Sequence, residues 1–180
     1  MIRLVLIAAI IIFYAIRWRF SVLKRASKNK ISRPLAVGEL LILAIAISQL
    51  AGFDPLKLNA PPILSYIGLA VALAGAIFAS IARLTLKQNY VPASAAGVPE
   101  NLVTGGIYRT VRHPAYLGTL LAFIGFELAL GSYLIFISLI LLVIIVKQIG
   151  KEEKTTALSF KDEWKDYTKK TPHKLIPLIF

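Results

Sequence analysis

The chain has 180 residues, of which 57% are hydrophobic and 17% charged, and its mean hydropathy is +0.73. This composition is too apolar for an ordinary soluble domain, in which about a quarter of the residues are charged. The chain has no cysteine, so disulfides and cysteine-ligated metals are excluded. The formal net charge is +12, but the cations form no basic stripe on a soluble fold, and we predict no binding of nucleic acid.

Long apolar windows predict an all-α integral membrane protein with five transmembrane helices. The first three spans are predicted over about 2–16, 35–53 and 63–82, and Pro34 marks the start of the second. The third span is rich in glycine and alanine. Because small residues let membrane helices approach closely, we expect this span in the middle of the bundle.

The next apolar stretch, 115–146, is too long for one span at a rise of 1.5 Å per residue. The turn signal Gly131-Ser132 predicts a hairpin of two helices, over about 114–130 and 132–148. The charged segment that follows, KQIGKEEKTTALSFKDEWKDYTKK, predicts a separate cytoplasmic helix that lies at the membrane interface.

The positive charges indicate an orientation. Most of the 21 Lys and Arg residues lie in 17–33, 83–113 and 147–180, which are alternate connections of the predicted bundle. By the positive-inside rule we place these segments and the C-terminus in the cytoplasm, and the N-terminus outside, in a multi-pass protein of the cell membrane. The basic segments are also expected to attract membrane lipids with anionic headgroups.

Two polar strips are expected to meet at the cytoplasmic end of the hairpin. One is ENLVTGGIYRTVRHPAYLG at 100–118, and the other begins at Lys147 and contains Glu152 and Glu153. Taken singly, these residues have ordinary interpretations as interfacial cations, an aromatic belt or a solvated helix face. Glu127, inside the apolar stretch, is interpreted either as a solvated turn residue or as a buried hydrogen-bonding group.

Over 83–180 the chain resembles the membrane methyltransferases, which include isoprenylcysteine carboxyl methyltransferases and phospholipid N-methyltransferases. Residues 112–118, RHPAYLG, match the RHPxYxG motif of that superfamily, and Glu152-Glu153 lies where its EE motif is found. The resemblance implies S-adenosylmethionine as the cofactor, S-adenosylhomocysteine as its product, no metal, and a lipophilic or lipid-modified acceptor. It also implies one domain over 1–180, with three spans in 1–82 and the cofactor-binding core in 83–180.

The resemblance also implies roles for individual residues. Acceptor and catalytic roles are expected for Arg112, Gln148 and Glu152. Aromatic faces attract a sulfonium cation, and a carboxylate suits the ammonium group of the cofactor. The cofactor-binding set that the resemblance implies is Glu100, Asn101, Leu102, Val103, Tyr108, His113, Tyr116, Gly118, Glu152 and Glu153.

The acceptor itself stays open between two chemical classes. Gln148 stands where the carboxyl methyltransferases carry an arginine for the substrate carboxylate, and glutamine cannot form a charged fork. A carboxylate would then be oriented by Arg112, Arg109 or Lys147 and would need no general base. A lipid amine would need to lose a proton, with Glu152, Glu153 or His113 as the candidate base. A membrane reductase that uses NADPH and a protein without catalytic activity are the further alternatives.

Overall fold

The computed structural model describes residues 1–21, 33–91, 99–177 and 179. The basic connection between the first two helices, over 22–32, therefore lies outside the described residues, as does 92–98. Over the described residues the chain is all-helical, as predicted, apart from one isolated β-bridge between Lys57 and Ser132.

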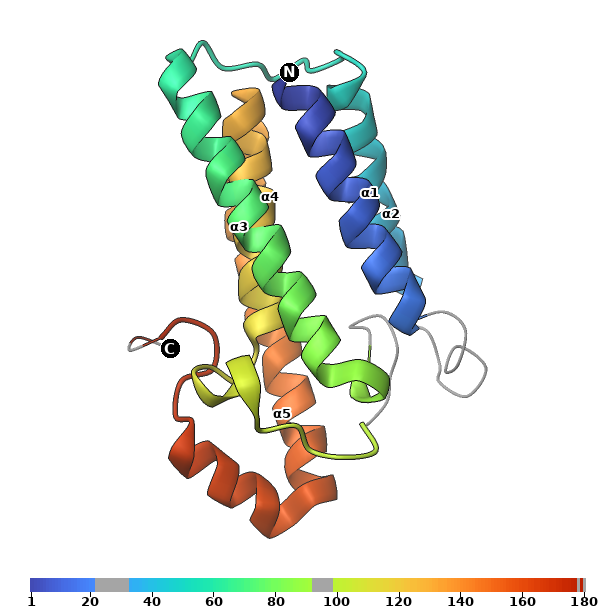
Figure 1. Ribbon diagram of the computed structural model, residues 1–180, viewed down its shortest axis with the longest axis vertical. Coiled ribbons are helices and arrows are strands. Elements are labelled where there is room, and N and C mark those ends of the chain that lie inside the picture. Colours follow the sequence, from blue (N-terminus) through green and yellow to red (C-terminus); the bar gives the residue numbers. More distant parts are fainter. Residues whose placement is uncertain (22–32, 92–98, 178, 180) are drawn as a thin grey trace.

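The described chain forms five α-helices, which Figure 1 shows as an elongated bundle with α5 extending beyond the others. Their bounds are α1 Ile2–Ser21, α2 Arg33–Leu50, α3 Pro62–Leu86, α4 Pro114–Leu130 and α5 Ile137–Lys170. Three short 3-10 helices join them, η1 Lys87–Asn89, η2 Gly106–Arg109 and η3 Tyr133–Phe136.

The ends of several helices differ from the sequence prediction. The helix α1 continues beyond 16 to Ser21, and α5 begins at Ile137 rather than at 132 because η3 precedes it. The helix α2 stops at Leu50 rather than near 53, because a turn closes there, with Gly52 at φ +101° and the Phe53 N–H donating to the Ser48 carbonyl over 3.0 Å. The helix α3 continues four residues beyond 82 to Leu86 and ends at Lys87, whose φ is +49°. Arg83 therefore lies within a helix and not in a basic loop.

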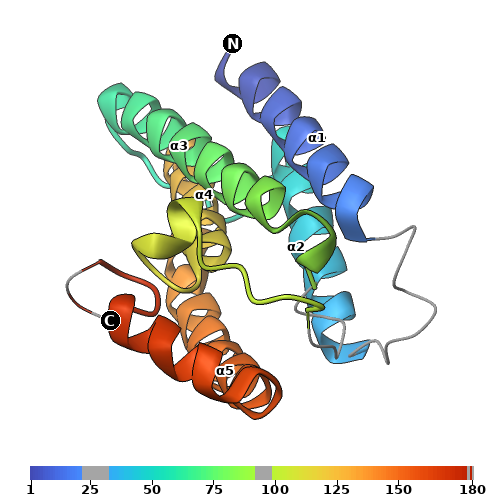
Figure 2. The same ribbon diagram turned by 60° about the horizontal axis from the view of Figure 1, so that its bottom comes forward.

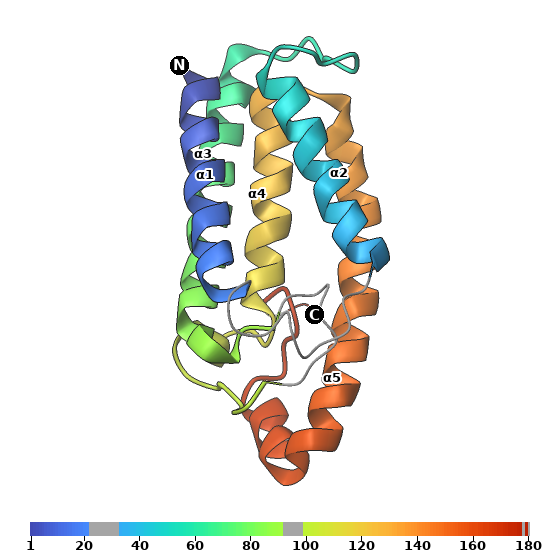
Figure 3. The ribbon, with the colours of Figure 1, turned by 90° about the vertical axis from the view of Figure 1, so that its right-hand side faces the viewer.

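The fourth and fifth helices form the predicted hairpin, and Figure 3 shows them side by side. The helix α4 ends at Gly131, which adopts the left-handed conformation with φ +64° and ψ +55°. Glycine adopts this conformation without a steric penalty, and such a residue commonly closes a helix. The Ser132 N–H then donates to the Glu127 carbonyl over 3.0 Å, which reverses the chain into η3 and α5.

The sequence predicts a separate interfacial helix that begins near Lys147, and this starting point is wrong. The helix α5 is assigned continuously from Ile137 through the charged residues to Lys170, because no residue after Lys147 prevents helix formation. The break lies instead at Lys161, with φ +42° and ψ −109°. Beyond it the chain turns back beneath the bundle (Figure 2), so that only the last turns of α5 form the expected surface segment.

The α3 and α4 backbones touch through glycine and alanine. A Cβ added to Gly75 would lie 2.3 Å from the Ala122 nitrogen, and one added to Gly125 would lie 2.2 Å from the Ala72 nitrogen. Contact this close requires residues without a side chain. The close approach predicted for the third span is therefore confirmed, although α4 rather than α3 is the central helix (Figure 3).

The outer faces of the helices are apolar. Large hydrophobic side chains on these faces are exposed, among them Ile11, Leu41, Ile77 and Val143. Among the described residues, Pro62–Leu86 and Tyr133–Lys170 are long and apolar enough to cross a membrane, whereas three apolar helices are shorter. An exposed apolar surface of this extent indicates a lipid or protein environment around the bundle.

Candidate active site

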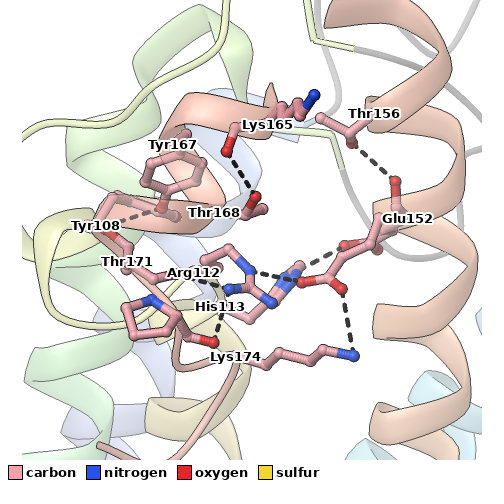
Figure 4. A network of polar contacts seen from close by, with 12 residues as sticks. Tyr108, Arg112, His113, Glu152, Thr156, Lys165, Tyr167, Thr168, Thr171 and Lys174 are labelled. Carbon is pink, nitrogen blue, oxygen red and sulfur yellow. Dashed lines mark hydrogen bonds and ion pairs between the residues drawn. The ribbon is translucent and has the colours of Figure 1, made fainter. Parts of the chain in front are cut away.

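The RHP motif and the EE pair meet at one end of the hairpin, as predicted (Figure 4). Arg112 precedes α4, and its Nε donates to Oε1 of Glu153 on α5 over 2.8 Å. His113 is next along the chain, and its Nε2 lies 3.2 Å from the same oxygen. Two polar strips that are 40 residues apart in sequence thus form one cluster.

The rest of the Arg112 guanidinium holds the C-terminal tail. Its Nη1 donates to the carbonyls of Thr171 and Pro172 over 2.6 and 2.8 Å. The backbone continues this attachment, because the Arg112 N–H donates to the His173 carbonyl over 3.0 Å. Arg112 is buried, with 8% of its surface exposed. In this structure, then, its Nε donates to Glu153 and its Nη1 donates to the tail.

Leu175 carries the tail into the core of the hairpin. This side chain is fully buried in a cluster with Leu120 of α4 and Ile145 and Ile149 of α5. Lys174 beside it places its Nζ 3.4 Å from Oε2 of Glu153. The tail therefore closes the end of the hairpin and adds a second cation to Glu153.

Pro114 explains how the motif enters α4. It occupies the first helical position, where its missing N–H costs no hydrogen bond. The residue before a proline avoids the helical conformation, and His113 has φ −126° and ψ 55°. The helix then places Tyr116 one turn further on, with its ring 6.0 Å from that of His113. Both aromatic rings thus stand on the side of α4 that meets α5.

Glu152 forms the second half of the cluster. Its Oε1 accepts hydrogen bonds from the Tyr116 hydroxyl and from Nε2 of Gln148, the latter over 3.1 Å. The Glu152 side chain keeps 34% of its surface exposed, against 14% for Glu153. The two acids therefore differ: Glu153 is enclosed by cations, whereas Glu152 retains an accessible carboxylate.

The surroundings of Glu153 hold it in its charged form. Burial by itself raises the pKa of Glu153, but hydrogen bonds from His113 and Arg112 outweigh burial and lower the pKa from 4.5 to about 2. Hydrogen bonds to the charged form of a carboxylate have this effect. The cluster is therefore a set of ion pairs at neutral pH.

We expect this cluster to make stability depend on pH in the acidic range. Because the folded pKa of Glu153 is depressed, its contribution is complete above about pH 4.5 and is lost as the pH falls toward 2. A depression of this size corresponds to a contribution on the order of 3 kcal/mol. In thermal unfolding in detergent, the Tm of wild type should be well above that of Glu153→Gln at pH 6. The difference in Tm should be smaller at pH 3. An equal gap at both pH values contradicts the assignment.

Other residues of the predicted set have different surroundings. Tyr108 is buried, and its hydroxyl donates to the Ala82 carbonyl of α3 over 3.4 Å. Burial raises the pKa of Tyr108, so its hydroxyl stays protonated. Gly118 faces α3, where a Cβ would lie 2.5 Å from the Ala79 nitrogen, so helix packing accounts for this glycine. Residues 100–103 lie in the connection before η2, where the Asn101 N–H donates to Oδ1 of Asn89 over 3.0 Å.

An apolar cavity of about 330 Å³ runs along α4 between the other helices. Tyr116 and Gln148 line one end, and Glu127 lines it eleven residues further along α4, which corresponds to roughly 16 Å of helix. Most of its remaining wall is apolar, with Phe13 of α1 and Phe126 among the lining side chains. Its volume is in the range of pockets that hold small ligands.

Glu127 lies at the far end of the cavity and is buried there. Its side chain is 1% exposed, and its Oε2 accepts a hydrogen bond from Nε2 of Gln49 over 2.9 Å. Of the two interpretations of the sequence, the buried hydrogen-bonding group is therefore correct. Gln49 was not predicted to take part, because nothing in the sequence of α2 indicates which polar residue faces α4.

A second polar residue beside the cavity was also missed. Arg83 is 4% exposed, and its Nη2 donates to Oγ1 of Thr119 over 3.0 Å. The available signal was a cation inside an apolar helix, where charged residues are usually functional. It was overlooked because the third span was taken to end at 82, which assigned Arg83 to the following basic segment.

Comparison with known proteins shows which family the chain resembles. A model of the phospholipid methyltransferase family matches residues 63–163. A rice protein described as a probable protein-S-isoprenylcysteine O-methyltransferase is 24% identical over 96% of this chain and 94% of its own length. The protein-S-isoprenylcysteine O-methyltransferase of Schizosaccharomyces pombe is 36% identical over 51% of this chain and 39% of its own.

A solved structure has the same fold. The eukaryotic intramembrane Ras methyltransferase, an isoprenylcysteine carboxyl methyltransferase, superposes with a TM-score of 0.61 at 25% identity. The match covers 88% of this chain, which spans 55% of that longer protein. The match of the family model over more than half of the chain is decisive: the chain belongs to the phospholipid methyltransferase family.

Proposed function

We propose that this methyltransferase transfers a methyl group from S-adenosylmethionine to the carboxylate of a lipophilic acceptor. The observation that carries the proposal is that Tyr116 and Gln148 belong both to the apolar cavity and to the polar cluster. Both line the apolar cavity, and both donate hydrogen bonds to Glu152 in the polar cluster. An acceptor with its apolar part in the cavity would therefore present its polar end to the cluster.

The residues of the cluster fit the cofactor. Glu152 is a partly exposed carboxylate that can accept hydrogen bonds from an ammonium group or from ribose hydroxyls. The aromatic rings of Tyr116 and His113 lie beside it, and aromatic faces attract a cationic sulfonium. When bound, S-adenosylmethionine supplies an electrophilic methyl group. We assign Glu152 to its polar part, with 100–103, Tyr108, His113 and Tyr116 in the surrounding shell. Gly118 packs against α3 and is left out of this shell.

The protein's part in such a transfer is to position the reactants and to exclude water. A carboxylate acceptor is already nucleophilic, so no residue needs to remove a proton. Holding the acceptor in line with the methyl group supplies much of the rate enhancement. The apolar wall of the cavity keeps water from competing. We assign Arg112 and Glu153 to positioning, because their ion pair fixes the RHP motif and the tail against α5.

We also propose that all five α-helices cross the bilayer, with the cluster and the C-terminus on the cytoplasmic side. The exposed apolar faces of α1, α2, α3 and α5 support this arrangement, as does the concentration of Lys and Arg in alternate connections. An acceptor could then enter the cavity from the membrane. Within this proposal the chain is one domain, of which 83–180 carries the site.

A second acceptor class has its own support. The matching family is described by phospholipid methylation, and Gln148 leaves the position of an expected arginine uncharged. An amine acceptor must lose a proton, and Glu152 is the accessible base of the cluster. We place this candidate second because both relatives described above are carboxyl methyltransferases by name.

A transfer assay separates the candidates. Purified protein in lipid nanodiscs is incubated with methyl-labelled S-adenosylmethionine and, separately, with an S-prenylated N-acetylcysteine or with phosphatidylethanolamine. We expect label in the prenylcysteine as a base-labile methyl ester. Label confined to the phospholipid amine supports the second candidate. No transfer to either acceptor, together with binding of NADPH, contradicts both and favours a reductase.

A further inference from the structure

Arg83 is a buried cation whose hydrogen-bonding capacity is not used. It lies in the last turn of α3, and its guanidinium carbon stands 4.4 Å from the centre of the Phe13 ring of α1. Nη2 donates to Thr119 of α4. Nε and Nη1 are buried and have no hydrogen-bond partner among the described residues.

Such an arrangement is costly without a further partner. A guanidinium stays charged at any physiological pH, and a buried charge normally has an ion-pair partner or a full set of hydrogen bonds. The nearby Phe13 ring provides a cation–π contact. A cation–π contact of this kind gives no acceptor to the N–H groups of Nε and Nη1. A bound anion would supply the acceptors that Nε and Nη1 lack among the described residues.

The position of Arg83 relates it to the cavity. Its guanidinium carbon also lies 6.0 Å from the centre of the Tyr90 ring. The two other contacting side chains, Phe13 and Thr119, line the cavity wall. Thr119 also follows Tyr116 by three residues on α4, so the two side chains are neighbours on one helix face. Arg83 is not itself a lining residue, so its guanidinium lies behind the part of the wall that Phe13 and Thr119 form. This part of the wall is next to Tyr116, which donates to Glu152.

The other candidate cations are engaged or lie elsewhere. Arg112 donates to Glu153 and to the tail carbonyls. Lys147 and Arg109 are exposed rather than buried. Gln148 lines the cavity but carries no charge. Among these side chains and Arg83, only Arg83 combines a buried position beside the cavity with donors that have no partner in the described structure.

We propose that Arg83 binds the carboxylate of the methyl acceptor and makes the site select acids over amines. This inference rests on the proposed methyl transfer and deepens it. Arg83 on α3 would take the role that the uncharged Gln148 on α5 cannot fill. A lipid amine would instead place its charge beside the guanidinium, and like charges repel.

The test compares binding of an acid and its neutral analogue. An S-prenylated N-acetylcysteine and its carboxamide differ in charge at one group. We expect wild type to bind the acid at least about tenfold more tightly, as a charged arginine contact provides. In Arg83→Met the preference should disappear and kcat/KM for the acid should fall about a hundredfold. Affinity for S-adenosylhomocysteine should stay within about twofold, which also shows that the variant is folded.

Two further variants sharpen the result. Arg83→Lys keeps the charge without the planar fork, and we expect it to retain part of the preference. If Arg83→Met does not fold, Arg83→Lys replaces it as the test variant. Lys154→Met removes an exposed cation of α5 and should leave the preference unchanged. The inference is overturned if Arg83→Met or Arg83→Lys keeps the full wild-type preference. It is also overturned if the variants instead lower the affinity for S-adenosylhomocysteine, since Arg83 would then bind the carboxylate of the cofactor.

Failure of the inference and failure of the proposed function give different results. If wild type neither binds S-adenosylhomocysteine nor transfers a methyl group, the proposed function fails and Arg83 has no acceptor to bind. If wild type methylates the acid and the Arg83 variants do so with the same preference, only the inference fails.

Discussion

Replacing Gly125 by alanine should destabilise the protein by at least about 2–3 kcal/mol. The new Cβ would lie 2.2 Å from the Ala72 nitrogen and 2.7 Å from the Gly68 carbonyl oxygen, both of them backbone atoms of α3. Backbone atoms cannot move aside as a flexible side chain can, so α3 and α4 must separate. Overpacking in a core costs about 1–3 kcal/mol, and a contact between two helix backbones is at the upper end of that range.

Gly150→Ala is the matched control for this change. It makes the same substitution inside α5, where an added Cβ would have no heavy atom within 4 Å. Since alanine is the better helix former, Gly150→Ala should raise stability by about 0.5–1 kcal/mol. Thermal unfolding of both variants in the same detergent gives the comparison. If Gly125→Ala is as stable as wild type, α3 and α4 are not packed as described.

Replacing Glu152 by glutamine should weaken binding of S-adenosylhomocysteine about tenfold to a hundredfold while the fold is kept. The substitution preserves shape and removes the charge. Hydrogen bonds to a charged group contribute about 1.5–3 kcal/mol, which corresponds to this range of affinity. A carboxylate acceptor needs no base. The kcat of Glu152→Gln, measured at saturating cofactor, should therefore stay close to that of wild type. Titration calorimetry and steady-state kinetics measure the two effects.

Asp166→Asn is the control for charge. It removes one carboxylate from the same helix, at a side chain that is 71% exposed and pairs with Lys169 at 4.0 Å, and it should change neither affinity nor rate. A different outcome for Glu152→Gln carries information. If cofactor affinity is unchanged and kcat falls together with its dependence on pH, Glu152 acts as a base, as an amine acceptor requires.

The hairpin could be predicted because its signals are local. Pro114 fixes the start of α4, and Gly131 supplies the left-handed residue at its end, so the predicted and observed bounds of α4 agree. The helix α5 begins at Ile137, after η3, rather than at the predicted 132. The end of α5 had no such signal. Charge after Lys147 marks the boundary of an apolar environment, but it does not break a helix, and the backbone changes direction only at Lys161.

The sequence could predict that the RHP motif meets the EE pair, but it could not predict which contacts each residue makes. Antiparallel helices bring the RHP motif to the EE pair by topology alone. The sequence does not reveal that the tail would take up the donors of Arg112, since this depends on how residues 171–175 fold back. Nor does it show that Glu153 is enclosed while Glu152 stays accessible, because neighbouring residues of a helix face different surroundings.

The account depends on the two strips of the hairpin forming one adenosyl-binding site, and a binding titration tests this most directly. Purified protein in nanodiscs is titrated with S-adenosylhomocysteine, and bound ligand is then displaced with S-adenosylmethionine. We predict saturable binding with one site per chain, weakened by Glu152→Gln and unaffected by Asp166→Asn. Absence of binding by a wild-type protein that unfolds cooperatively would contradict the account.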